Sequence, residues 1–211
     1  MNKFQDLIEL DHLHRMAEDE IDEYAGCLAR AFQGYSLFEY FAEGNYDLKE
    51  MQHFWEVSLR TAYKDILCIS NDGDPEAVAL FSPRDYKDAG FFEYLKAGGG
   101  KLIFEFGPIT VAKMLAFEQF AGKIKEKYSN ENCWYLYSFA VDPNYQGKGY
   151  GSMLLKPMLS YLDRVGHDCY LETLKDTNVD LYEHYGFELM ESTPVPGTDM
   201  ILYAMLRKAK K

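Results

Sequence analysis

Long apolar runs are missing from this chain. No stretch of roughly eighteen apolar residues occurs, so no transmembrane helix is predicted. The segment 1–6 lacks the apolar core of a secretory signal, and we expect a cytoplasmic protein. The chain has four cysteines and no C-x-x-C pair, which argues against a zinc site or a disulfide framework and favours buried thiols. His12 and His14 have no nearby third ligand, and we predict no metal site.

Basic residues are also scarce. The sequence has 22 Lys and Arg against 34 Asp and Glu, a net charge of −12. Phosphate backbones require a basic surface, so we expect no nucleic-acid partner. An acidic protein suits a cationic substrate such as an amine, but acidity also serves solubility alone, and both readings stay open. Nothing in the sequence decides between a monomer and a homodimer.

A glycine-rich stretch, Gln146–Gly151, is the most informative feature present. It lies between a strand-like run, 134–141, and a helix-like run, 151–165. Glycines at the start of a helix leave several N–H groups unpaired and let a ligand approach the backbone closely. The helix dipole adds positive character there. The stretch therefore predicts a pyrophosphate cradle.

Two well-known glycine loops do not fit this stretch. A P-loop requires Lys-Ser or Lys-Thr after its last glycine, which is absent. A dinucleotide fingerprint requires G-x-G-x-x-G, whereas Gly147, Gly149 and Gly151 alternate. What remains is the pattern Gln-x-x-Gly-x-Gly, carried by Gln146, Gly149 and Gly151.

This pattern resembles the acyl-CoA signature of the GNAT superfamily of N-acetyltransferases. The flanks match as well: Phe139-Ala140-Val141-Asp142-Pro143 precedes the loop, and Leu181-Tyr182-Glu183-His184-Tyr185-Gly186-Phe187 follows downstream. The sequence over 134–187 looks most like the puromycin-acetyltransferase-like branch. The resemblance implies acetyl-CoA as co-substrate. It also implies backbone contacts to the co-substrate from the strand end, which is Phe139, Ala140 and Val141. It implies further contacts from Asn178 and from the loop, which is Gln146, Gly147, Lys148, Gly149, Tyr150, Gly151 and Ser152.

Two residues are candidates for the chemistry. By resemblance, Tyr182 lies near the CoA sulfur and is the candidate general acid, with packing of one helix face as the alternative. Glu172 stands in an apolar strand, where an acid is costly without a partner or a function. The resemblance implies that it deprotonates the incoming amine; the alternative is a salt-bridged or surface-facing residue. Thr177 and Asp180 are predicted to form a capping box.

The expected fold is an α/β (α+β) GNAT fold. It has a mixed central sheet of about six to seven strands, splayed at the acyl-CoA site and flanked by helices. We expect one domain over 1–211, with a substrate-side half, 1–133, and an acyl-CoA-binding half, 134–211. The stretch 84–130 departs from a minimal acetyltransferase and is predicted to be a helical insertion with a joint at the glycines 98–100.

The expected activity is transfer of an acetyl group from acetyl-CoA to a primary amine of a small molecule, by direct attack in a ternary complex. Two alternatives stay open: a protein or peptide N-acetyltransferase, and a non-catalytic acyl-CoA-binding sensor. Aromatic residues of the first half are predicted either to wall the acceptor or to fill the core of the extra helices. They include Phe38, Tyr40, Phe41 and Trp55.

Overall fold

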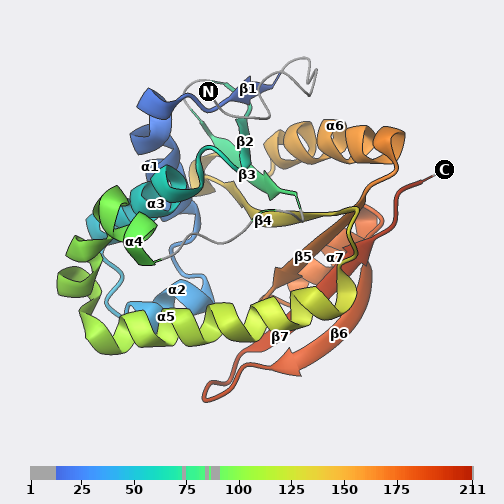
Figure 1. The fold of residues 1–211 in the computed structure, drawn as a ribbon. Helices are drawn as coiled ribbons and strands as arrows, with labels where there is room; N and C mark the ends of the chain where they lie inside the picture. Colours follow the sequence, from blue (N-terminus) through green and yellow to red (C-terminus); the bar gives the residue numbers. More distant parts are fainter. Residues whose placement is uncertain (1–12, 73–74, 84–85, 87–90, 211) are drawn as a thin grey trace.

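The structure, a computed structural model, describes residues 13–72, 75–83, 86 and 91–210. One mixed sheet of seven strands runs through it in the order β1-β2-β3-β4-β5-β7-β6 (Figure 1). All neighbours are antiparallel except β4 and β5, which are parallel. The predicted fold class is thereby confirmed. The strands are β1 His14–Arg15, β2 Leu67–Ser70, β3 Ala77–Ser82, β4 Cys133–Val141, β5 Asp168–Thr173, β6 Glu188–Pro194 and β7 Ile201–Arg207.

In the described residues, seven α-helices flank the sheet: α1 Ile21–Ala31, α2 Ser36–Phe41, α3 Leu48–Ala62, α4 Phe91–Tyr94, α5 Gly100–Tyr128, α6 Tyr150–Val165 and α7 Thr177–His184. Short 3-10 turns cover Glu18–Glu20 and Pro143–Tyr145, and Leu95–Gly99 is π-helical. The sequence also predicts a short first strand over 7–13, which lies outside the described residues except for Leu13. Among the described residues, no helix is long and apolar enough to cross a membrane.

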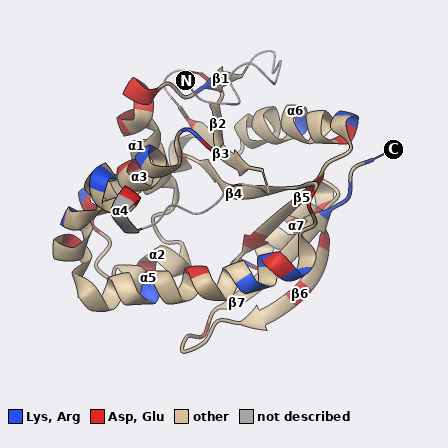
Figure 2. Ribbon diagram, viewed as in Figure 1, with Lys and Arg blue, Asp and Glu red and all other residues tan. Residues whose placement is uncertain are grey.

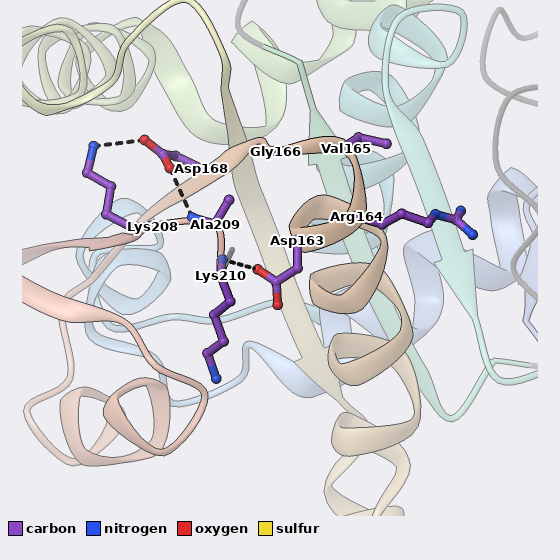
Figure 3. A pocket seen from close by; sticks show the side chains of 8 residues that line it. All are labelled: Asp163, Arg164, Val165, Gly166, Asp168, Lys208, Ala209 and Lys210. Carbon is purple, nitrogen blue, oxygen red and sulfur yellow. Dashed lines mark hydrogen bonds and ion pairs between the residues drawn. The ribbon is translucent and has the colours of Figure 1, made fainter.

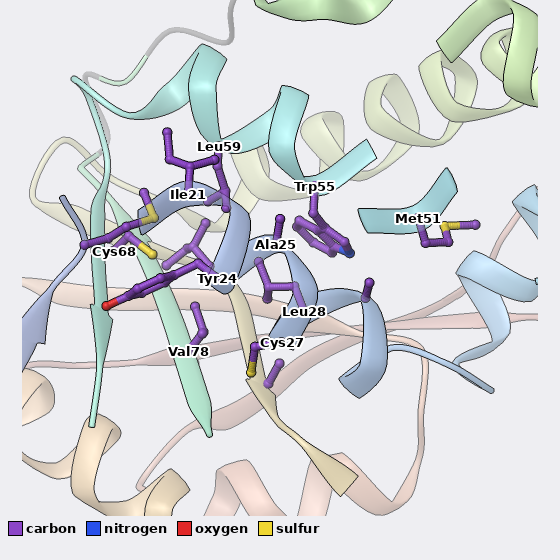
Figure 4. Packing of buried hydrophobic residues seen from close by; sticks show 14 of the residues in the cluster. Ile21, Tyr24, Ala25, Cys27, Leu28, Met51, Trp55, Leu59, Cys68 and Val78 are labelled. Atoms are coloured by element: carbon purple, nitrogen blue, oxygen red, sulfur yellow. The ribbon is translucent and has the colours of Figure 1, made fainter. Parts of the chain in front are cut away.

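The helices cover the two faces of the sheet in distinct groups. On one face α6 packs through leucines such as Leu154 and Leu162, which are fully buried, and α7 packs through Tyr182. On the other face α1, α2 and α3 form a second core, in which Tyr24, Leu28 and Trp55 lie together (Figure 4). Helix α5 covers the remaining part of that second face, where it packs against β5 and β7. The sheet thus separates a side bearing α6 and α7 from a side bearing α1, α3 and α5.

The predicted aromatic cluster belongs to the second core. Phe38, Phe41 and Trp55 are buried there, and Phe32 stacks on Trp55 with centroids 5.3 Å apart. Within the described residues, this supports the core reading over the acceptor-wall reading for these three side chains. Helix α2, which carries Phe38, lies in a stretch where no element was expected.

The long helix α5 is broken near its start. Gly107 has φ 74° and ψ 159°, outside the helical region, and Pro108 follows it. Gly98, at the predicted glycine joint, has φ 106° and interrupts the preceding π-helical segment. Glycine tolerates such positive φ angles, and proline lacks the N–H that a continuous helix would require. The uninterrupted part of α5 after Pro108 is the segment that reaches across β5 and β7.

Candidate functional site

The two central strands part in the middle of the sheet. β4 and β5 pair at three positions, the last of which sets Tyr135 opposite Tyr170. From there β4 runs on to Val141 and β5 to Thr173 without pairing. A register shift in the β3–β4 ladder makes Tyr137 the extra residue of a bulge, which bends β4 at the parting. We call this opening the β4–β5 split.

The end of β4 turns its backbone toward the split. Just past the strand, the Asp142 N–H donates to the Glu76 carbonyl over 2.8 Å, which makes these two a hydrogen-bonded pair of the antiparallel ladder. Hydrogen-bonded and non-hydrogen-bonded pairs alternate, so Val141 and Phe139 face away from β3. The Gln146 side chain donates to the Val141 carbonyl over 3.2 Å. The strand end and the glycine loop are thereby joined.

The glycine loop opens α6 with unpaired amides. Gly147 and Gly149 have φ of 76° and 89°, the left-handed region that glycine adopts readily. Gly149 is the N-cap and has no side chain to cap the helix, and the first backbone bond runs from the Met153 N–H to the Gly149 carbonyl. Within the described residues, no hydrogen bond satisfies the amides from Gly147 to Ser152. An anion suits such a helix start.

Gly151 lets the helix start approach β4 closely. A Cβ built on Gly151 would lie 2.8 Å from Cζ of Phe139. Real Cβ atoms do not approach an aromatic carbon that closely, so any larger residue would push the loop or the ring away. The glycine thus keeps the cradle against the split strand.

The remaining loop side chains hold the loop itself. Lys148 donates to the Asn144 carbonyl over 3.1 Å and lies 4.7 Å from the centroid of the Tyr145 ring. Tyr150 meets the same ring edge-on at 6.0 Å. The Ser152 hydroxyl is 2.7 Å from the hydroxyl of Tyr185, the residue that caps the end of α7, which ties the start of α6 to the end of α7.

Helix α7 brings Tyr182 and Asn178 to the α6 side of the split. Tyr182 is buried and packs edge-on against Phe187, and burial raises the pKa of its phenol, keeping it protonated. Asn178 donates to the Thr173 hydroxyl over 3.1 Å at the end of β5. The predicted capping box is wrong: Asp176 is the N-cap and its carboxylate accepts from the Thr177 N–H, so Thr177 is the first residue of the helix and not its cap.

Glu172 lies on the opposite face of the sheet from Tyr182. Its Oε1 accepts from the Tyr135 hydroxyl over 2.5 Å. Oε2 is buried and makes no hydrogen bond of good geometry among the described residues, although the Tyr170 hydroxyl on the same strand also interacts with the carboxylate. Burial raises the pKa of Glu172 to about 7, against the opposing hydrogen bond from Tyr135 and the charge of Lys125. Its environment is therefore that of a carboxylic acid that loses its proton near neutral pH. Within the described part of the chain Glu172 forms no salt bridge, and it is not surface-facing, so neither form of the structural alternative fits it.

Tyr35, which the sequence analysis did not single out, ties the first helices to the end of β5. Its hydroxyl accepts from the Leu174 N–H over 2.8 Å and lies 3.3 Å from the Thr173 hydroxyl. The hydroxyl therefore belongs to the same network as Asn178. No local pattern marks this residue, because its partners stand almost 140 positions away in the chain.

The four thiols are all free and buried, as predicted. Burial raises the pKa of Cys169 and that of Cys27, so neither is prepared to act as a nucleophile. His14 pairs with Glu20 at 2.8 Å. Among the residues that the structure describes, no group of three or more His, Cys, Asp or Glu is arranged to hold a metal ion.

A hollow at the other end of α6 is unrelated to the split. Figure 3 shows it lined by the last turn of α6 and the segment after β7. Its polar groups are engaged with one another: Asp168 with Lys208 at 2.8 Å, and Asp163 with the Lys210 N–H at 2.8 Å. These interactions hold the segment after β7 against the end of α6.

Comparisons with known proteins agree with this geometry. The family model for the acetyltransferase (GNAT) family matches residues 28–187. A stretch of 72 residues is 36% identical to an uncharacterized N-acetyltransferase of Schizosaccharomyces pombe, and covers 34% of this chain. That match spans 28% of the curated relative's own length.

Two solved structures share the whole fold. A histone acetyltransferase HPA2 and related acetyltransferase from Corynebacterium glutamicum superposes with a TM-score of 0.64 at 19% identity, over 94% of this chain and 96% of that one. A mosquito arylalkylamine N-acetyltransferase-like protein gives 0.57 at 14% identity, over 93% and 98%. At these identities the likeness speaks for the fold.

Proposed function

Because the chain belongs to the acetyltransferase (GNAT) family, a family of acyl-CoA-dependent acetyltransferases, we propose that it transfers an acetyl group from acetyl-CoA to the primary amine of a small molecule. The observation that carries the proposal is the β4–β5 split, with an unpaired-amide cradle at its α6 side and the buried Glu172 at its other side. This arrangement separates a place for an anion from a place for an amine.

The residues of the split fit acetyl-CoA. The amides from Gly147 to Ser152 would take the pyrophosphate, because they are unpaired and lie at a helix start. The backbones of Phe139 and Val141, with Ala140 between them, would run beside the pantetheine arm, since both end residues face the split. The Val141 N–H would donate to the thioester oxygen and stabilise the negative charge that develops there.

Two side chains would move the protons. An alkyl ammonium has a pKa near 10, so the acceptor must lose a proton before it attacks. Glu172 would accept that proton, directly or through water, because its pKa lies near neutrality. Tyr182 would supply a proton to the departing CoA sulfur, as a phenol that burial keeps protonated. The buried thiols favour direct attack over an acyl-enzyme.

The kind of acceptor is argued from the α1, α3 and α5 face. There α5 crosses β5 and β7 beside Glu172, which covers the approach and favours a small molecule over an extended peptide. The fold itself serves both, since one neighbour is titled a histone acetyltransferase and another an arylalkylamine N-acetyltransferase-like protein. The wording of residues 134–187 supports the puromycin-acetyltransferase-like branch, which we retain within the proposal.

A panel of amines that includes puromycin, read by release of the CoA thiol, tests the activity. Thermal melting with and without acetyl-CoA tests the cradle separately. A ligand at about a hundred times its Kd stabilises a protein by about 2.7 kcal/mol. A melting shift with turnover of a small amine is the expected result. A shift without turnover of any amine or peptide would indicate a non-catalytic sensor, and turnover of peptides alone would indicate a protein acetyltransferase.

A further inference from the structure

We infer that Lys125, on helix α5, occupies the position of the acceptor's ammonium group and that the acceptor exchanges with it on binding. The amine site is thus filled by the protein's own amine until a cationic acceptor arrives. The inference rests on the proposed function for the meaning of the site, but the binding event can be tested without acetyl transfer.

The position of the Lys125 ammonium is defined by a tyrosine. Its Nζ lies 4.6 Å from the centroid of the Tyr135 ring, within the range of a cation–π contact. The hydroxyl of that same tyrosine donates to Glu172. The rings of Tyr137 and Tyr170 stand 5.6 Å and 5.9 Å from Tyr135. An ammonium here faces aromatic rings and a carboxylate, the two groups that attract organic cations.

The site has unused hydrogen-bonding capacity. Oε2 of Glu172 and the hydroxyl of Tyr170 are both buried, and neither makes a hydrogen bond of good geometry among the described residues, although the two side chains interact with each other. Buried polar atoms are almost always satisfied in folded proteins, and an unsatisfied one is a reason to look for a ligand. An ammonium group carries three N–H donors. The ammonium group of Lys125 lies over the Tyr135 ring. A free amine, which is not tethered to α5, would approach over the same ring and donate to both oxygens.

The charges around Glu172 come from few elements. Helix α5 contributes Lys125 and, two turns earlier, Glu118, whose negative charge raises the pKa of Glu172 while Lys125 lowers it. Strands β4 and β5 contribute Tyr135 and Tyr170, and Tyr35 lies within electrostatic reach. On β6, Glu191 is already held by Lys127 and Tyr128. Lys125 is the cation acting on Glu172 among the described residues.

An exchange of ammonium groups keeps the charge of the site constant. Lys125 is partly exposed and has a long flexible stem, so its strongly hydrated head can return to water. A cationic acceptor that replaces it keeps a positive charge near Glu172, whereas a neutral ligand would leave a buried carboxylate without one, which is strongly unfavourable. The site is therefore selective for an acceptor that arrives protonated, with an apolar or aromatic body to contact the tyrosines.

The test uses n-propylammonium chloride, which reproduces the end of a lysine side chain. Lys125→Ala leaves room for it, and Lys123→Ala is the matched control on the same helix, at an exposed position. Melting temperatures are measured against equal concentrations of sodium chloride, without acetyl-CoA. We expect a saturable rise for Lys125→Ala, with an apparent affinity about tenfold tighter than for the wild type or Lys123→Ala. Adding Glu172→Gln to Lys125→Ala should abolish the rise.

Equal responses of Lys125→Ala and Lys123→Ala would overturn the inference. A second measurement needs no variant: lysines of the wild type are reductively methylated with a 13C label and followed by NMR during the titration. The Lys125 signal should move toward that of a solvated lysine while the Lys123 signal stays, and an unmoved Lys125 signal would refute the exchange. Both measurements stand if no amine is acetylated, so failure of the proposed function would be seen separately, in the panel.

Discussion

The Tyr135 hydroxyl donates to Glu172 over 2.5 Å at the point where β4 and β5 separate. The two residues come from the two strands that part, and their side chains meet on the face covered by α5. The last pair of the parallel ladder is Tyr135 opposite Tyr170, two residues before Glu172. The contact therefore holds Glu172, the proposed general base, in place where the split begins.

The pH dependence of acetyl transfer should follow Glu172. With a pKa raised by burial to about 7, the side chain is a base only above that pH, so kcat/KM should rise through about pH 7 and level off above it. Glu172→Gln should remove this dependence and lower kcat by about 10²- to 10³-fold. The profile is measured by CoA thiol release, with acetyl-CoA saturating and the acceptor well below its KM. A rising limb retained by Glu172→Gln would assign the base elsewhere.

The same raised pKa predicts a stability effect of definite sign. The folded chain binds the Glu172 proton more tightly than the unfolded chain, where the usual value is 4.5. The contribution to stability is therefore full below about pH 4.5 and is lost as the pH rises through about 7. Glu172→Gln should melt higher than the wild type at pH 8, and the difference should shrink at pH 5.5. Melting curves at the two pH values measure it, and a difference that does not change with pH would contradict the shift.

Tyr182→Phe should lower kcat by about tenfold or more and leave KM for acetyl-CoA nearly unchanged, if the hydroxyl acts in the transition state. The ring is retained, so its packing on Phe187 and the melting temperature should persist. Tyr161→Phe on α6, a partly buried tyrosine away from the split, is the control. Unchanged kcat in Tyr182→Phe would make this tyrosine a packing residue.

Gly151→Ala should weaken acetyl-CoA binding. The added methyl would stand 2.8 Å from the Phe139 ring, so the ring or the helix start must move, and both belong to the proposed cradle. Gly122→Ala on α5 is the matched control, because a Cβ there meets nothing within 4 Å. In a helix that exchange stabilises by about 0.5–1 kcal/mol. Isothermal titration with acetyl-CoA compares them, and equal affinities would remove Gly151 from the cradle.

Asp163→Asn should destabilise the fold by about 3 kcal/mol without affecting the split. Arg207 is nearly fully buried at 4% side-chain exposure and makes two bonds of 2.7 Å to the Asp163 carboxylate. The hydrogen bond from Arg207 lowers the pKa of Asp163, so this contribution is present above about pH 4 and is lost as the pH falls below it. Urea unfolding at pH 7 and at pH 3 should show the loss chiefly at pH 7.

Local pattern predicts most elements and is also the basis of the proposed cofactor side of the site. It predicts helices over 48–63 and 151–165 and strands over 66–70, 77–82 and 134–141, which agree with α3, α6, β2, β3 and β4 within a residue or so. Periodicity and glycine chemistry act over neighbouring residues, and these elements depend on them. Helix α2 was missed because six residues rich in aromatics carry too little periodicity.

The acceptor side could not be predicted in the same way. Glu172 and Tyr135 are 37 positions apart in the sequence, and Tyr35 and Leu174 are 139 positions apart. Lys125 lies on a helix without any recognised motif. Such contacts depend on the order of strands in the sheet, which no window of sequence contains. The sequence alone therefore leaves two roles open for Glu172, the base and a structural residue. The buried Oε2, which lacks a well-formed hydrogen bond, favours the role of base.

The brevity of the β4–β5 ladder has a consequence for how the molecule unfolds. β1 to β4 form one hydrogen-bonded ladder and β5 to β7 another, and three residue pairs join them. Two weakly joined ladders can open as separate units, each with its own free energy of opening. A ligand that pairs with both facing edges would merge them into one cooperative unit. Amide exchange in β5 and β7 should then slow in step with that in β3 and β4 as acetyl-CoA saturates the protein.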